Sequence, residues 1–123
     1  EIRYMEERSD YPAMVEALGK WFAEVHSKGV LVKDLSPGNT LFRPTAQGDY
    51  DFCLVDVNRM GFNCHNLRRQ LYRAGWLMNS EQSSMDFAHH YAIAAGMDTT
   101  QAEHIVLDSY RRLQRRAARK KRP

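Results

Sequence analysis

The sequence has few of the features that define secreted and membrane-spanning proteins. Only two cysteines, Cys53 and Cys64, occur in 123 residues, so a disulfide framework is excluded, and neither has the Cys-x-x-Cys or Cys/His spacing typical of zinc sites. No apolar run reaches the ~18 residues of a membrane span, and the first residues do not resemble a signal peptide. We therefore expect a cytoplasmic protein.

Internal repeats and low-complexity linkers are also missing, which favours one compact domain. The charge, however, is unevenly distributed along the chain. Residues 1–110 hold ten Lys and Arg and fifteen Asp and Glu, whereas residues 111–123 hold eight Lys and Arg and no acid. We accordingly divide the chain into a main domain, residues 1–110, and a basic C-terminal tail, residues 111–123.

Apolar periodicity and turn residues predict a mostly helical α+β fold. A first helix is expected between Asp10 and Gly29, because apolar residues recur there every three or four positions. Three short strands, the second and third forming a small hairpin, and an irregular segment should follow, and then three helices. The expected strands are 30–32, 40–42 and 52–55, the irregular segment is 58–66, and the later helices are 67–77, 82–95 and 101–119.

The residues that point most clearly to chemistry lie around these strands. Asp34 and Asn39 are five positions apart across a loop that Pro37 and Gly38 force to turn, so their side chains can converge. Asp56 follows directly after an apolar strand. Oxygen ligands from an amide and a carboxylate suit Mg²⁺, and a second carboxylate can accept a proton from a hydroxyl nucleophile.

Two motifs carry a resemblance to a known superfamily. Residues 32–39 read Val-Lys-Asp-Leu-Ser-Pro-Gly-Asn and residues 56–58 read Asp-Val-Asn. They resemble the His-Arg-Asp catalytic loop and the Asp-Phe-Gly metal-binding segment of protein-kinase-like enzymes. The stretch from His26 to Asn39, together with 54–60, is most similar to the bacterial lipopolysaccharide kinase family of the Kdo/WaaP type, and the later helices and the basic end also fit that family.

This resemblance implies a kinase-like C-terminal lobe that uses ATP and Mg²⁺ to phosphorylate a sugar hydroxyl of the lipopolysaccharide core. Asp34 would be the catalytic aspartate, which orients the acceptor hydroxyl and takes its proton. Lys33 occupies the arginine position of the loop, where a cation can pair with nearby acids. Asn39 and Asp56 would bind Mg²⁺, and Asn39 would also brace the loop.

Three departures from the kinase pattern refine this expectation. Val32 replaces the loop histidine, so support for the loop must come from packing or from elsewhere in the fold. Ser36 stands where kinases acting on proteins usually have a lysine, which favours a small molecule or sugar as acceptor. No glycine-rich loop, strand lysine or helix glutamate precedes Asp34, so the N-terminal lobe is absent from this chain. We expect a fragment of an active kinase that is inactive alone.

Alternatives remain open for both the activity and the basic end. The chain is alternatively a non-catalytic, pseudokinase-like or basic-tailed binding module, or a phosphotransferase of the aminoglycoside type, which shares the Asp-x-x-Pro-Gly-Asn pattern. The segment Arg111–Arg122 is either a solvated end or a surface attracted to anionic membrane lipid or phosphorylated lipid. Peripheral association with the inner membrane is thus one option. Nucleic acid is a less favoured partner, since no groove-reading motif accompanies these charges.

Overall fold

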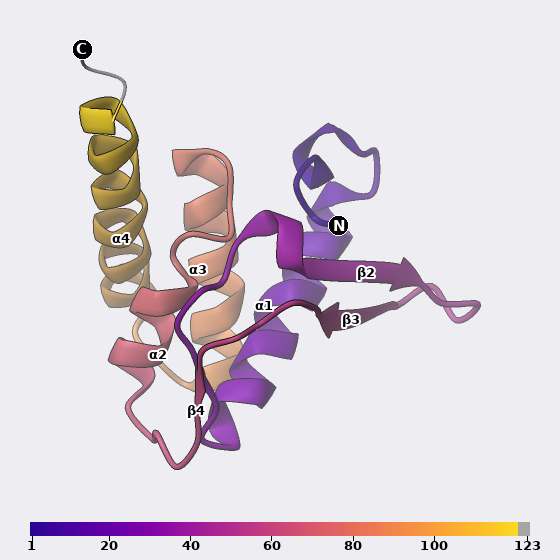
Figure 1. Ribbon diagram of the computed structural model, residues 1–123. Helices are drawn as coiled ribbons and strands as arrows, with labels where there is room; N and C mark the ends of the chain where they lie inside the picture. Colours follow the sequence, from indigo (N-terminus) through magenta and orange to yellow (C-terminus); the bar gives the residue numbers. More distant parts are fainter. Residues whose placement is uncertain (121–123) are drawn as a thin grey trace.

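The computed structural model describes residues 1–120, and within them it has a mainly helical α+β fold, as the sequence predicts (Figure 1). Lys121 and Arg122 of the basic end lie outside the described residues. The helices are α1 (Tyr11–Ser27), α2 (Leu67–Ala74), α3 (Glu81–Ala95) and α4 (Thr99–Lys120), with 3-10 turns at Met5–Glu7 and Pro37–Asn39. The strands are β1 (Leu31–Val32), β2 (Thr40–Pro44), β3 (Tyr50–Leu54) and β4 (Met60–Gly61).

Helices α1 and α3 form the centre of the apolar core. The α1 residues Met14, Leu18 and Phe22 are fully buried, which confirms the helix predicted from their spacing. Phe22 meets Phe87 of α3 edge to face, with ring centroids 5.8 Å apart. The two helices approach closely at Gly19, where an added Cβ would lie 2.8 Å from the backbone nitrogen of Tyr91.

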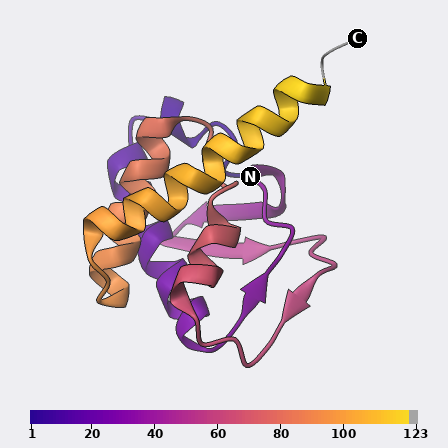
Figure 2. The same ribbon diagram turned by 90° about the vertical axis from the view of Figure 1, so that its left-hand side faces the viewer.

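Helix α4 packs on α3 and α2, and its last turns project beyond the rest of the fold (Figure 2). Its contact with the end of α2 is tight, because a Cβ on Gly75 would collide with the side chain of Ser109. Ser109 is buried, and its hydroxyl donates to the Tyr72 carbonyl at 2.7 Å. The boundary between residues 110 and 111, drawn from charge alone, lies inside this continuous helix.

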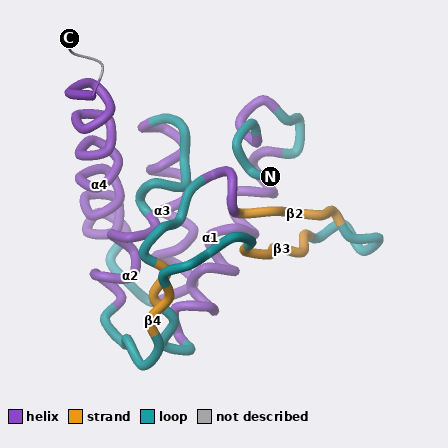
Figure 3. Tube along the Cα trace, in the orientation of Figure 1, coloured by secondary structure: helices purple, strands orange, loops and turns teal. Residues whose placement is uncertain are grey.

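The strands form two separate antiparallel pairs (Figure 3). Strands β2 and β3 make the predicted hairpin, with Thr40 opposite Leu54 and Pro44 opposite Tyr50. Strand β4 lies in the segment predicted to be irregular, and it pairs with β1 so that Val32 faces Met60. A two-residue strand has no alternation for a sequence pattern to detect, so its pairing is decided by the tertiary fold.

The later helices follow the predicted order with shifted ends. Helix α2 ends at Ala74 rather than at residue 77, because the chain turns at Gly75. Ser80 caps α3, since its hydroxyl accepts from the backbone N–H of Ser83 at 3.1 Å. None of the helices within residues 1–120 is both long and apolar enough to cross a bilayer.

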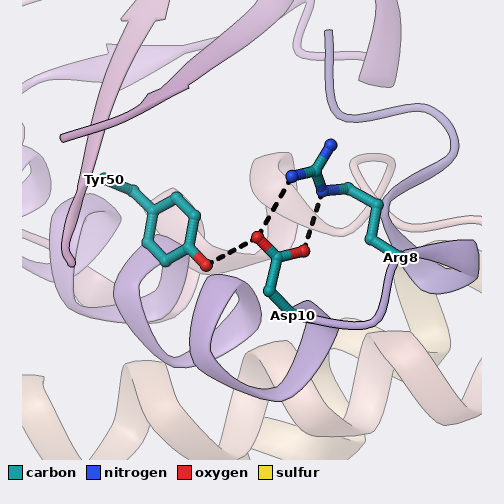
Figure 4. A network of polar contacts seen from close by, with 3 residues as sticks. All are labelled: Arg8, Asp10 and Tyr50. Atoms are coloured by element: carbon teal, nitrogen blue, oxygen red, sulfur yellow. Dashed lines mark hydrogen bonds and ion pairs between the residues drawn. The ribbon is translucent and has the colours of Figure 1, made fainter. Parts of the chain in front are cut away.

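A polar network ties the N-terminal segment to the hairpin (Figure 4). The Arg8 guanidinium donates to both carboxylate oxygens of Asp10, at 2.8 and 3.1 Å, and the Tyr50 hydroxyl donates to the same carboxylate at 2.8 Å. The hydrogen bond from Arg8, followed by that from Tyr50, lowers the pKa of Asp10 to about 2. Asp10 occupies the N-cap position of α1, yet its side chain caps no backbone N–H because these two partners hold it.

Candidate active site

The loop between β1 and β2 is braced from within by Asn39. Its side-chain Nδ2 donates to the Asp34 carbonyl at 2.9 Å, and its Oδ1 accepts from the Ser36 backbone N–H at 3.0 Å. Ser36 and Asn39 thereby form a capping box on the turn Pro37–Asn39. The bracing role expected for Asn39 is present, and its Oδ1 keeps one lone pair that these contacts do not use.

Packing supports the loop at the position where kinases have a histidine. Val32 and Leu35, on either side of Asp34, are both about 1% exposed and belong to the apolar core. Lys33 is held between them by its backbone N–H, which donates to the Arg59 carbonyl at 2.9 Å. The position of Asp34 is therefore fixed from both sides along the chain.

The two oxygens of the Asp34 carboxylate have different environments. Oδ2 accepts from the backbone N–H of Asn58 at 3.2 Å, which links the loop to the segment after β3. Oδ1 is buried and has no hydrogen-bond partner within the described residues. A buried carboxylate oxygen without a partner is costly, and it is the type of atom that a substrate hydroxyl or a cation satisfies.

Asp56 lies between two points that fasten its segment to the loop. On one side the Val55 N–H donates to the Asn39 carbonyl at 2.9 Å, and on the other the Asn58 N–H donates to Asp34. Asp56 itself has a left-handed backbone with φ of 53°, a conformation that costs a non-glycine residue about 1 kcal/mol or more. Its side chain is exposed and makes no hydrogen bond or ion pair within the part of the chain that is described.

Lys33 does not form the ion pair expected from the kinase pattern, since none joins it to a carboxylate within residues 1–120. Its side chain instead lines a small cavity with Tyr72, Arg73 and Trp76. The lysine thus lies against α2 and the turn that follows it, where the neighbouring charge is positive.

The donor set fits Mg²⁺ in chemical type. Asp34, Asn39 and Asp56 offer hard oxygens on two segments that hydrogen bonds hold together. Among residues 1–120, no three or more His, Cys, Asp or Glu side chains gather as a metal site. The predicted Mg²⁺ ligands are one acid, Asp56, and one amide, Asn39.

The chain matches no protein-family model, no curated protein and no solved structure. Its function is therefore inferred from its own residues.

A buried polar cluster that the sequence did not predict lies beside the chain that enters β1. His26 is 1% exposed, and its Nδ1 lies 2.6 Å from the Tyr91 hydroxyl. The Gln70 side chain donates to the carbonyls of His26 and Val30, both at 2.9 Å, and so ties α2 to the chain entering β1. His26 and Gln70 are far apart in sequence, and no local pattern connects them.

Sequence reasoning also missed the basic residues of α2. Arg69 and Arg73 are four positions apart, as are Tyr72 and Trp76, so each pair shares one side of the helix and its C-terminal turn. This four-residue spacing is the sequence signal from which a basic face of α2 could have been predicted. The structure places these side chains beside the arginines of α4.

Proposed function

We propose that the chain is the C-terminal lobe of an ATP- and Mg²⁺-dependent kinase that phosphorylates a sugar hydroxyl of the lipopolysaccharide core. The observation that carries this proposal is the fastening of Asp34, Asn39 and Asp56 to one another. The Asn39 side chain holds the Asp34 carbonyl, and the Asp34 carboxylate holds the segment that contains Asp56. A turn that merely used polar residues for loop geometry would not need this cross-connection.

In the proposed reaction Asp34 positions the acceptor hydroxyl and takes its proton. The hydrogen bond from Asn58 fixes the orientation of the carboxylate through Oδ2. The carboxylate held in this way would accept a hydrogen bond from the acceptor hydroxyl. Phosphoryl transfer depends mainly on positioning and charge stabilisation, so a rigidly held carboxylate is what this role requires.

Asn39 and Asp56 are the residues that would hold Mg²⁺. Bound there, the ion would neutralise charge on the phosphates of ATP. The left-handed backbone at Asp56 supports this assignment, since strained non-glycine residues cluster at functional sites. Contacts to the rest of the nucleotide would come from an N-terminal lobe, so we propose that residues 1–123 are inactive alone.

The proposed acceptor class is based on Ser36 in the loop, and the proposed cellular location is based on the basic end of α4. Ser36, in place of the lysine of protein-directed kinases, supports a sugar or other small acceptor. Arginines of Arg111–Arg122 would attract anionic lipid by about 1 kcal/mol per basic residue near a charged surface. We therefore propose a cytoplasmic protein that associates peripherally with the inner membrane.

Two observations favour a second candidate, a non-catalytic binding module with the same fold. Lys33 has no acidic partner within the described residues. Both the oxygen and the nitrogen of the Asn39 side-chain amide already brace the loop. Within the enzyme class, an aminoglycoside-type phosphotransferase remains the other candidate.

A manganese titration separates the catalytic from the non-catalytic candidate. Mn²⁺ added to the 123-residue chain should broaden the NMR signals of residues 34–39 and 55–58, and Asp56→Asn should remove this effect. Asp51→Asn is the matched control, since Asp51 is an exposed strand carboxylate that pairs with Arg43 at 3.0 Å. Broadening that Asp56→Asn leaves unchanged would favour the binding module.

A transfer assay tests the activity itself. A chain that also carries an N-terminal lobe should transfer phosphate from ATP to lipopolysaccharide core, and Asp34→Asn should slow transfer by about 10²-fold or more. The 123-residue chain should show no transfer. Robust, Asp34-dependent turnover by that chain would contradict the requirement for a second lobe.

A further inference from the structure

A groove lined by arginines runs between α2 and α4. It consists of two adjoining hollows, which share Tyr72, Arg112 and Arg116 in their walls. We call it the arginine groove, and its cations are Arg69, Arg73, Arg112, Arg115, Arg116 and Arg119. Asp108 is the one acid that lines either hollow.

Asp108 apart, no acid within residues 1–120 lines the arginine groove. Within residues 1–120 none of its six arginines forms an ion pair with a carboxylate, whereas Arg111, on another side of α4, pairs with Glu81 at 2.7 Å. Like charges gathered on two packed helices repel one another, and a bound anion relieves this repulsion. The charge of the groove is therefore available to a ligand.

The walls of the groove are held in place by specific contacts. The Trp76 indole N–H donates to the Ser109 carbonyl at 3.2 Å, and the Arg116 guanidinium lies 5.4 Å from the centroid of the Trp76 ring. Arg112 donates to the Tyr72 hydroxyl at 3.4 Å. The close approach of α2 and α4 at Gly75 and Ser109 fixes the spacing of the two walls. Some of the guanidinium groups are thus positioned before any ligand arrives.

We propose that the arginine groove binds a small ligand carrying two or more phosphate groups. A guanidinium offers paired N–H donors that match phosphate oxygens, and arginines from two facing helices can engage several phosphates together. A single-stranded nucleic acid would require open aromatic faces for its bases, and Arg116 already lies over the ring of Trp76. A flat bilayer surface would not follow the hollow between the helices, which includes the α2 arginines.

A small cavity beside the arginine groove borders the loop that carries Asp34. Lys33, next to Asp34, lines this cavity together with Tyr72, Arg73 and Trp76, three residues that also line the arginine groove. The inference goes beyond the proposed kinase activity and does not depend on it, because binding is measured without ATP or turnover.

Calorimetric titration of the 123-residue chain with inorganic tripolyphosphate tests the proposal. The groove variant is Arg69→Gln with Arg112→Gln. The matched control is Arg68→Gln with Arg111→Gln, which removes the same charge from adjacent positions of the same helices outside the groove. Losing charge-assisted hydrogen bonds should weaken binding about tenfold or more in the groove variant. The control should change by about twofold or less, since it alters only long-range charge.

Two results would overturn the proposal. Equal weakening in the groove variant and the control would show that only diffuse charge attracts the anion. Absence of tripolyphosphate binding, with binding to phosphatidylglycerol vesicles that both variants retain, would identify a general membrane-attracting surface instead. Circular dichroism should show the same helix content in all variants, and Arg116→Gln is a second groove variant should the first fail to fold.

Discussion

Acid should destabilise this fold through the single buried histidine of α1. His26 is 1% exposed, its Nδ1 contacts the Tyr91 hydroxyl, and its Nε2 has no hydrogen-bond partner within the described residues. Burial lowers the pKa of His26 to about 4 from an ordinary value of 6.5. The perturbation is therefore a fall in pH, tested in the parent chain and in His26→Asn, which keeps an acceptor for Tyr91.

The size and sign of the effect follow from proton linkage. Below pH 6.5 the unfolded chain binds a proton at His26, while the folded chain stays neutral until about pH 4. The stabilisation is complete above pH 6.5 and is lost as the pH falls through the window from 6.5 to 4. A shift of this size corresponds to about 3 kcal/mol in total, and to about 2 kcal/mol between pH 7 and pH 5.

Urea unfolding at pH 7, 6 and 5 measures this loss. His26→Asn should be less stable than the parent at pH 7 but should lose about 2 kcal/mol less on acidification. His104→Asn, which changes an exposed histidine, should retain the parental pH dependence. The lowered pKa of Asp10, about 2, places its own titration below this window, so it does not interfere.

Either of two results would show that His26 does not cause the loss of stability in acid. If His26→Asn and the parent lose equal stability between pH 7 and pH 5, His26 is not the group responsible. If NMR titration of the folded chain gives a His26 midpoint near 6.5, burial does not hold the imidazole neutral.

Two further predictions concern backbone packing and the loop. Gly19→Ala should lower the free energy of unfolding, measured by urea, by about 1–3 kcal/mol, because the new Cβ would press on α3. Gly61→Ala is the control, since its Cβ would meet no atom closer than 3.8 Å, and it should be neutral or slightly stabilising in the same assay. Equal effects would contradict the close approach. Asn39→Ala removes two hydrogen bonds and should lower the free energy of unfolding by about 1–2 kcal/mol. Hydrogen exchange at the Ser36 amide should become faster, and unchanged exchange there would argue against the brace.

Much of the fold could be predicted because its signals are local. The spacing of Met14, Leu18 and Phe22 predicts α1, and two apolar runs around a polar turn predict the β2–β3 hairpin. The brace from the Asn39 side chain to the Asp34 backbone carbonyl spans only five residues, so it is also a local contact, while the convergence of the two side chains stays a prediction. The boundary at residue 110 had no such signal, since charge changes there while the helix continues.

The sequence by itself determined the order of the four helices and of strands β1 to β3, and the candidate residues Asp34, Asn39 and Asp56. The tertiary structure decided how Asp56 is fastened to the loop, through a hydrogen bond between residues 24 positions apart, and how strand β4 pairs. It also decided the burial of His26 against Tyr91, 65 positions away, and the meeting of α2 and α4 arginines in one groove. Local propensity acts over a few residues, whereas these contacts exist only once the helices pack.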